Sequence, residues 1–179
     1  MSILPQKYSW LSKEEGPKML TEALRHYGTL EHKDSANNPS IIKWANELGK
    51  PVADVYKADS IPWCGLFMGI VAKRCGYEPP KSPLWALSWS TFGDRAECGK
   101  LGYVLVFVRN GGGHVALYVG EDAASYYTLG GNQADSVCIT RMPKSRLYTI
   151  RKPIYKRAEP KNVRSIILSV GGALSTNEA

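Results

Sequence analysis

The apolar residues in the first half of the chain repeat every three to four positions, which is the period of a helix with one buried face. In the earliest example, four side chains share a face: Leu20, Ala23, Leu24 and Tyr27. The same spacing predicts four helices, over residues 17–28, 39–48, 62–75 and 84–92. Gly76 directly follows the third of them, at the position where glycine commonly ends a helix.

The hydrophobic period changes in the second half of the chain. β-Branched and aromatic residues form short runs separated by turn-forming segments, which predicts strands. These runs are residues 103–108, 114–120, 125–130 and 136–140. Short connections between successive strands predict an antiparallel meander, and helices followed by strands predict an α+β fold.

The chain has 179 residues, enough for one domain with its own core. We expect that domain to cover residues 1–155 and a C-terminal tail to cover residues 156–179. The apolar segment 166–170 is too short for a membrane anchor, so we expect the tail to dock on the domain or fray.

The composition, 44% hydrophobic and 22% charged, is that of a globular protein and excludes a disordered chain. A net charge of +7 predicts attraction to polyanions. No phosphate loop, zinc knuckle or recognition helix is present, so we expect no nucleic-acid partner. No apolar stretch is long enough to span a membrane, and the N-terminus lacks the apolar core of a signal peptide. We therefore expect synthesis in the cytoplasm and no stable membrane insertion.

The cysteines stand at positions 64, 75, 98 and 138, and none forms a C-x-x-C pair, so we expect free thiols and no metal site. Cys64 lies in the first turn of the third predicted helix, where unpaired N–H groups and the helix dipole favour a thiolate. Cys75 lies at the other end, where the dipole disfavours a thiolate. Cys75 is therefore expected in the core, whereas Cys64 is either a small buried hydrophobe or a nucleophile.

The three histidines differ in their surroundings. His26 and His32 are expected on the surface, the first on a helix and the second in a polar loop. His114 follows a glycine-rich turn and opens a predicted strand, where alternation places it on one face with Ala116 and Tyr118. From there it can meet a helix N-terminus across the layer. A satisfied structural histidine is the alternative interpretation.

Asn132 and Gln133 follow the next predicted strand, in "LGGNQAD". If the two strands pair, these amides return to the His114 end, where one can accept a hydrogen bond from the imidazole and fix its tautomer. Turn chemistry alone also explains Gly and Asn at this place. Together, a cysteine on a helix, a histidine on a strand and a polar residue on the next strand follow the order of nucleophile, base and orienting group.

Four blocks of the sequence resemble the papain-like cell-wall hydrolases of the CHAP/NlpC group, which are cysteine- and histidine-dependent amidohydrolases and peptidases. The blocks are "GTLEHKDSANNPSIIKWA", "IPWCGLFMGIVAKRCGY", "GHVALYVGED" and "LGGNQAD", and the resemblance covers roughly residues 15–145. It is closest to a subfamily of small phage- and bacteria-encoded proteins. The chain departs from many relatives in having Tyr103 where they have an aspartate, and no acidic residue in "LGGNQ".

This resemblance implies a papain-like fold in which Cys64 is the nucleophile, His114 the general base and Asn132 the polar third member. Gln133 or a backbone group is the alternative for that third role. The reaction implied is hydrolysis of a peptidoglycan amide, either the N-acetylmuramoyl-L-alanine bond or a stem or cross-bridge peptide bond, through a thioester and without a metal or cofactor. The substrate-binding candidates are Trp63, Gln133 and Trp85, the last with Trp89 four residues on; core packing is the alternative for the tryptophans.

We expect a monomer that acts in the periplasm or cell wall after release or injection. A phage endolysin released by a holin fits these expectations, and so does an injected antibacterial effector with an immunity partner. Two further alternatives are a non-catalytic wall-binding module of the same fold and a cytosolic cysteine protease or transamidase.

Overall fold

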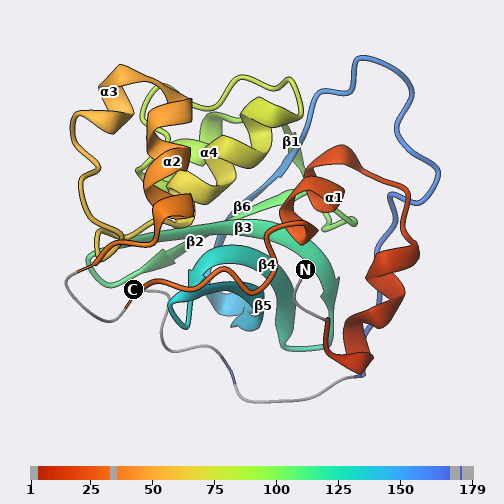
Figure 1. The fold of residues 1–179 in the computed structure, drawn as a ribbon. Coiled ribbons are helices and arrows are strands. Elements are labelled where there is room, and N and C mark those ends of the chain that lie inside the picture. The colour runs from red at the N-terminus through yellow and green to blue at the C-terminus, as the bar shows by residue number, and fades with distance from the viewer. Residues whose placement is uncertain (1–3, 33–35, 170–173, 175–179) are drawn as a thin grey trace.

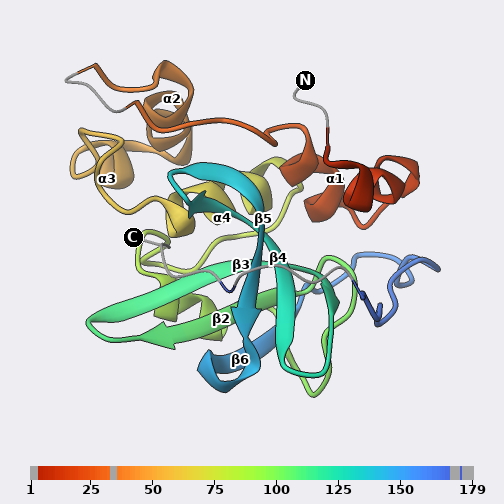
Figure 2. The same cartoon turned by 90° about the horizontal axis from the view of Figure 1, so that it is seen from below.

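The computed structural model describes residues 4–32, 36–169 and 174. Helices lie on one side of an antiparallel sheet (Figures 1 and 2), which confirms the α+β class. The α-helices are α1 (Lys18–Leu24), α2 (Pro39–Leu48), α3 (Lys50–Ala53) and α4 (Cys64–Arg74). The 3₁₀ helices are η1 (Gln6–Lys13), η2 (Ala86–Thr91) and η3 (Lys144–Arg146).

The sheet formed by the described residues has six strands in the order β1-β6-β2-β3-β4-β5. Their bounds are β1 (Asp94–Ala96), β2 (Val104–Arg109), β3 (Gly112–Glu121), β4 (Ser125–Gln133), β5 (Ser136–Pro143) and β6 (Leu147–Lys152). The predicted meander corresponds to β2 through β5, which pair in chain order and antiparallel. The strands β1 and β6 were not predicted; β6 returns to pair with β2, and β1 extends the sheet beyond it.

The two faces of the sheet belong to different cores. Val115, Leu117 and Val119 of β3 belong to the main core, together with the apolar faces of the helices. Tyr118, which alternates with them, belongs to a second core with Phe107 of β2. This alternation confirms the expected face pattern of β3.

Helix α4 is surrounded by protein, and every residue from Cys64 to Ala72 is buried. Gly65 lets the chain run directly against its first turn, since a Cβ there would lie 2.3 Å from the carbonyl oxygen of Pro83. The helix begins at Cys64, two residues after the predicted start at position 62. It ends as predicted, with Gly76 in the left-handed conformation at φ +78°.

The C-terminal segment docks on the domain as far as it is described. The N–H of Leu101 donates to the carbonyl of Arg164, and the N–H of Leu168 donates to that of Glu121. Val163 is buried in the second core. The tail was expected either to dock on the domain or to fray. Up to residue 169, the structure shows that it docks.

No helix in the described part of the chain is both long and apolar enough to cross a membrane.

Candidate active site

Cys64 is the first residue of α4 and is only 4% exposed. Burial raises the pKa of its thiol, and this effect outweighs hydrogen bonds from the backbone N–H groups of Val115 and Gly65 that favour the thiolate. The positive charge of Arg109 also favours the thiolate. The helix N-terminus was expected to lower the pKa of Cys64, and this expectation is corrected, because the effect of burial on the pKa is larger. The groups that stabilise the thiolate are nevertheless present.

Cys75, at the other end of α4, provides the comparison. Burial and the nearby charge of Glu22 raise the pKa of its thiol to about 11. Backbone N–H groups lower the pKa of the Cys64 thiol, whereas the charges of Lys18 and Arg25 do so for Cys75. The two ends of the helix thus differ as their positions predict: backbone N–H groups favour the thiolate of Cys64 but not that of Cys75.

The N–H of Val115, the residue after His114 on β3, is one of the groups that favour the Cys64 thiolate. The β3–β4 ladder begins only at Leu117, so this part of the edge is open to the helix terminus. His114 itself lies opposite Phe107, on the face of the second core. Helix α4 therefore packs on the face of β3 that carries Val115, and His114 belongs to the opposite face, in the part of β3 before its ladder with β4 begins.

The imidazole of His114 is fully buried, and its Nε2 lies 3.0 Å from Oε1 of Gln133. The orientation of the Gln133 amide follows from its other contacts: Nε2 donates to the carbonyl oxygens of Thr128 at 3.1 Å and Cys138 at 2.6 Å. Its Oε1 must therefore accept, and so Nε2 of His114 carries the hydrogen. In the neutral imidazole this leaves the lone pair on Nδ1, which is the atom a general base needs.

Asn132 lies beside this network, and its hydrogen bond differs from the role expected for it. Its Oδ1 accepts from the backbone N–H of Trp63 at 2.9 Å, which fixes the residue immediately before Cys64. Asn132 has φ +56°, a conformation that asparagine tolerates better than most residues. The amide bonded to His114 is that of Gln133, so Gln133 contacts the imidazole and Asn132 contacts the residue before α4.

The other two histidines lie outside this group. His26 was expected on the surface, but it is half-buried, its Nε2 lying 3.2 Å from Glu22 and its ring 5.2 Å from that of Trp44. Helix α4 packs beside His26 and brings Arg74 to the carboxylate of Glu22, which the sequence pattern alone did not reveal. His32 is exposed, as expected, and its backbone N–H donates to Asp59.

The tryptophans divide between the core and a surface cavity. Trp63 is fully buried and its indole N–H donates to Glu31 at 3.0 Å, so its ring packs in the core and does not line a groove. Trp89 is likewise buried. Trp85 is 60% exposed and lines a cavity of about 690 Å³ together with Leu87 and Tyr148.

That cavity lies beside segments that pack against the candidate site. A Cβ on Gly113 would lie 2.6 Å from Leu87, so Leu87 covers the residue before His114. The carbonyl oxygen of Leu84, the residue before Trp85, similarly lies against Gly65. The segment that lines the cavity therefore packs against the residues next to Cys64 and His114.

Several functional positions were missed at the level of sequence. Arg109 acts on Cys64 through its charge, and Thr128 and Cys138 hold the amide of Gln133. Arg109 had a recognisable signal, since it stands beside the glycine turn before His114. The roles of Thr128 and Cys138 depend on the β4–β5 pairing and carry no local signal.

Metal-binding geometry is not found in the part of the chain that the structure describes: no three His, Cys, Asp or Glu side chains are grouped as ligands.

Comparison with models of known protein families and with curated proteins finds no match to this sequence.

Proposed function

We propose that this chain is a papain-like cysteine amidohydrolase that cleaves an amide bond of bacterial peptidoglycan. The observation that carries the proposal is the Gln133 amide, whose two carbonyl acceptors oblige it to accept from Nε2 of His114. A buried histidine held in this tautomer, next along β3 to the Val115 N–H that favours the Cys64 thiolate, supports the assignment of a thiol nucleophile and its base.

In this mechanism Nδ1 of His114 takes the proton from Sγ of Cys64. The thiolate attacks the amide carbonyl carbon, and the resulting tetrahedral intermediate collapses as the C–N bond breaks. The leaving amine takes the proton from His114, which leaves a thioester on Cys64. Water then attacks the thioester, giving its proton to His114, and the acid product leaves as the thiol is restored.

The same groups explain how a buried thiol can react. Its raised pKa keeps Cys64 protonated until a base acts, and the Val115 and Gly65 N–H groups with Arg109 then stabilise the anion. We assign the oxyanion to N–H groups in the first turn of α4, which have no partners within the helix; one such donor is typically worth about 3 kcal/mol.

The cavity beside Trp85 is the proposed substrate groove. Its exposed aromatic rings, Trp85 and Tyr148, suit the apolar faces of sugars, and the hydroxyls of Ser82, Ser88 and Ser90 suit polar groups of a glycan or stem peptide. A net charge of +7 favours retention on an anionic wall. A phage endolysin and an injected antibacterial effector both fit this activity.

Digestion of purified sacculi by the full chain, with products identified by mass spectrometry, tests the proposal. We expect new free amino groups at one type of amide, and no comparable cleavage of casein. Cys64→Ala is prepared in parallel as a control. Cleavage that persists in this variant would come from a contaminating enzyme.

Cleavage of casein without cleavage of sacculi would replace the wall substrate with protein. Saturable sacculus binding without cleavage of sacculi from either Gram type would instead favour a non-catalytic wall-binding module.

A further inference from the structure

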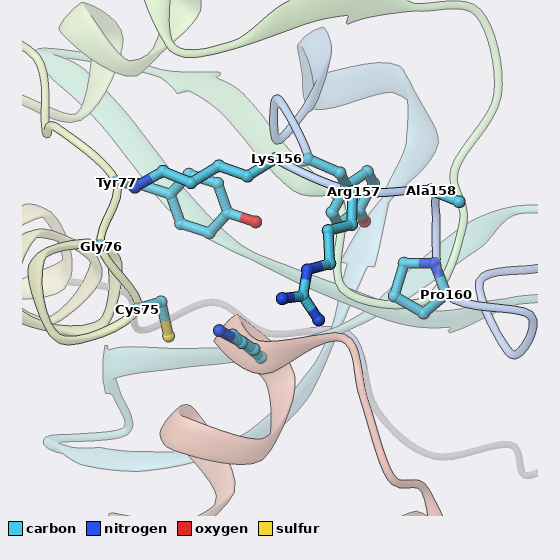
Figure 3. Close-up of a pocket in the computed structure, with 9 residues that line it drawn as sticks. Cys75, Gly76, Tyr77, Lys156, Arg157, Ala158 and Pro160 are labelled. Carbon is cyan, nitrogen blue, oxygen red and sulfur yellow. The ribbon is translucent and has the colours of Figure 1, made fainter.

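A second cavity, of about 490 Å³, lies at the end of α4 opposite to Cys64 (Figure 3). Residues from three separate parts of the chain line it: Lys18, the stretch 75–77, and five residues between positions 155 and 160. The 11 residues of α4 separate it from Cys64 by about 16 Å, at 1.5 Å per residue. Its volume is typical of sites for small molecules or for single groups of a larger ligand.

Positive charge is concentrated in this cavity. Lys18, Lys156 and Arg157 line it, and no acidic residue does. None of these three cations takes part in an ion pair found among the described residues. In Figure 3 the Arg157 guanidinium points into the cavity, toward the side where Cys75 lies.

Two acidic groups that act electrostatically on lining residues are paired with cations outside the cavity. Glu22, which acts electrostatically on Cys75, is paired with Arg25 and Arg74. Glu159, which acts on Tyr155, is paired with two lysines and accepts from a tyrosine: Lys100, Lys152 and Tyr103. The C-terminus of α4 contributes a partial negative charge of about half a unit, which three full positive charges outweigh. The cavity therefore carries a surplus of positive charge.

Neutral donors complete the lining. The hydroxyl of Tyr155 is buried and has no hydrogen-bond partner among the described residues. Burial, with the charges of Glu159 and Tyr77, raises its pKa, so the hydroxyl stays protonated as a donor. Burial and the nearby charge of Glu22 raise the pKa of Cys75 to about 11, so this thiol does not repel an anion at neutral pH.

We propose that this cavity is a binding site for a phosphate group. A phosphomonoester offers three terminal oxygens and up to two negative charges, and a phosphodiester offers two terminal and two bridging oxygens, which matches three cations and a phenol donor better than the two oxygens of a carboxylate do. Arginine is suited to bidentate contact with phosphate, and lysine acts on it as a point charge. The site is independent of Cys64 chemistry, and its ligand is either a small phosphomonoester or a phosphodiester of a polymer.

Isothermal titration of the full chain at low salt tests the site with glycerol 3-phosphate, poly(glycerol phosphate) and succinate as probes. We expect saturable binding of at least one phosphate probe and weaker binding of succinate. Tighter binding of glycerol 3-phosphate identifies a monoester site, and tighter binding of the polymer per phosphate identifies a polymer site.

The variants separate this site from the general charge of the surface. We expect Lys156→Gln with Arg157→Gln to weaken phosphate binding about tenfold or more, because two charge-assisted contacts are lost. Lys43→Gln with Lys57→Gln removes the same charge from exposed positions elsewhere and should change binding less than about twofold. Tyr155→Phe keeps every charge and should weaken binding about fivefold.

The proposal is overturned if neither phosphate probe binds saturably to the wild-type chain. It is equally overturned if succinate binds as tightly, or if the two double variants weaken binding to the same extent. Circular dichroism of each variant identifies any that fails to fold; Tyr155→Phe, which removes one oxygen atom, then provides the decisive comparison.

Discussion

At the scale of single residues, Gln133 determines which nitrogen of His114 can accept a proton. Its amide is fully buried and makes four hydrogen bonds, two through each end. Such a network fixes the imidazole in one tautomer without adding charge, and neighbours of this kind typically change activity by about 10- to 100-fold when removed.

Gln133→Ala should therefore lower kcat by about 10- to 100-fold with little change in KM. Gln133→Glu places a carboxylate beside the imidazole, which favours the imidazolium and raises the pKa of His114. The base is then free only at higher pH, so the acidic limb of kcat/KM should move to higher pH. Both profiles are measurable from the release of amino groups from sacculi. A loss of activity in Gln133→Glu with an unmoved limb would show that Gln133 has a structural role only.

The residue scale also shows where sequence reasoning stops. Cys64 and His114 could be singled out as candidates from a predicted helix start and strand start, but only the family resemblance implied their roles. The choice between Asn132 and Gln133 could not, because adjacent residues in a bulged, positive-φ segment do not follow simple alternation. Similarly, the pKa direction of Cys64 depends on burial by segments distant in sequence, which the helix position alone does not reveal.

At the scale of elements, the turn between β3 and β4 joins the strand of His114 to the strand of Gln133. Asp122 in this turn accepts from four groups: the N–H groups of Ala124 and Ser125, the hydroxyl of Tyr127 and the guanidinium of Arg141. Burial opposes its ionisation, but these donors outweigh burial and lower its pKa to about 2. The turn thus depends on a charged carboxylate.

Because the folded-state pKa of Asp122 is below its ordinary value of 3.8, the stability it contributes is present above about pH 4 and is lost as pH falls toward 2. Asp122→Asn should cost about 1–2 kcal/mol at pH 7 and flatten the decrease of Tm between pH 4 and 2. Thermal unfolding across this range measures both effects. Asp54→Asn, at an exposed i,i+4 pair, is the control and should leave the decrease unchanged. Equal acid sensitivity in wild type and Asp122→Asn would contradict this account.

Periodic elements with local signals were predictable. The predicted second helix has the bounds of α2, and the four predicted strands correspond to β2 through β5. The strand β6 was missed because its residues show weak alternation and its partner, β2, lies some 40 residues earlier in the chain. The three-residue strand β1 exists only because β6 is there to pair with it.

At the scale of the whole molecule, the C-terminal segment is part of the fold and not an appendage. Its backbone pairs with β3 at Glu121, and Arg164 forms an ion pair with Glu14 near the N-terminus at 2.8 Å. A boundary after residue 155 would cut off Val163, which is 7% exposed and lies in the second core. The domain therefore extends beyond the expected boundary.

Val163→Ala should lower stability by about 1.6 kcal/mol, at about 0.8 kcal/mol for each buried CH₂, and lower Tm by about 3–6 °C for a chain of this size. Ile167→Ala removes a larger side chain four residues on, but that side chain is 77% exposed. It should change Tm by less than about 1 °C. Differential scanning calorimetry of both variants checks the difference, and equal shifts would mean that the segment is not docked through Val163.

The central claim is that Cys64 is the nucleophile of an amidohydrolase. The most direct test compares initial rates of amide cleavage in purified sacculi for Cys64→Ala and Cys98→Ala, since Cys98 is an exposed cysteine outside the site. We predict that Cys98→Ala retains the wild-type rate within about twofold and that Cys64→Ala, folded by circular dichroism, loses about a thousandfold or more. A Cys64→Ala protein that cleaves as fast as Cys98→Ala would contradict the account.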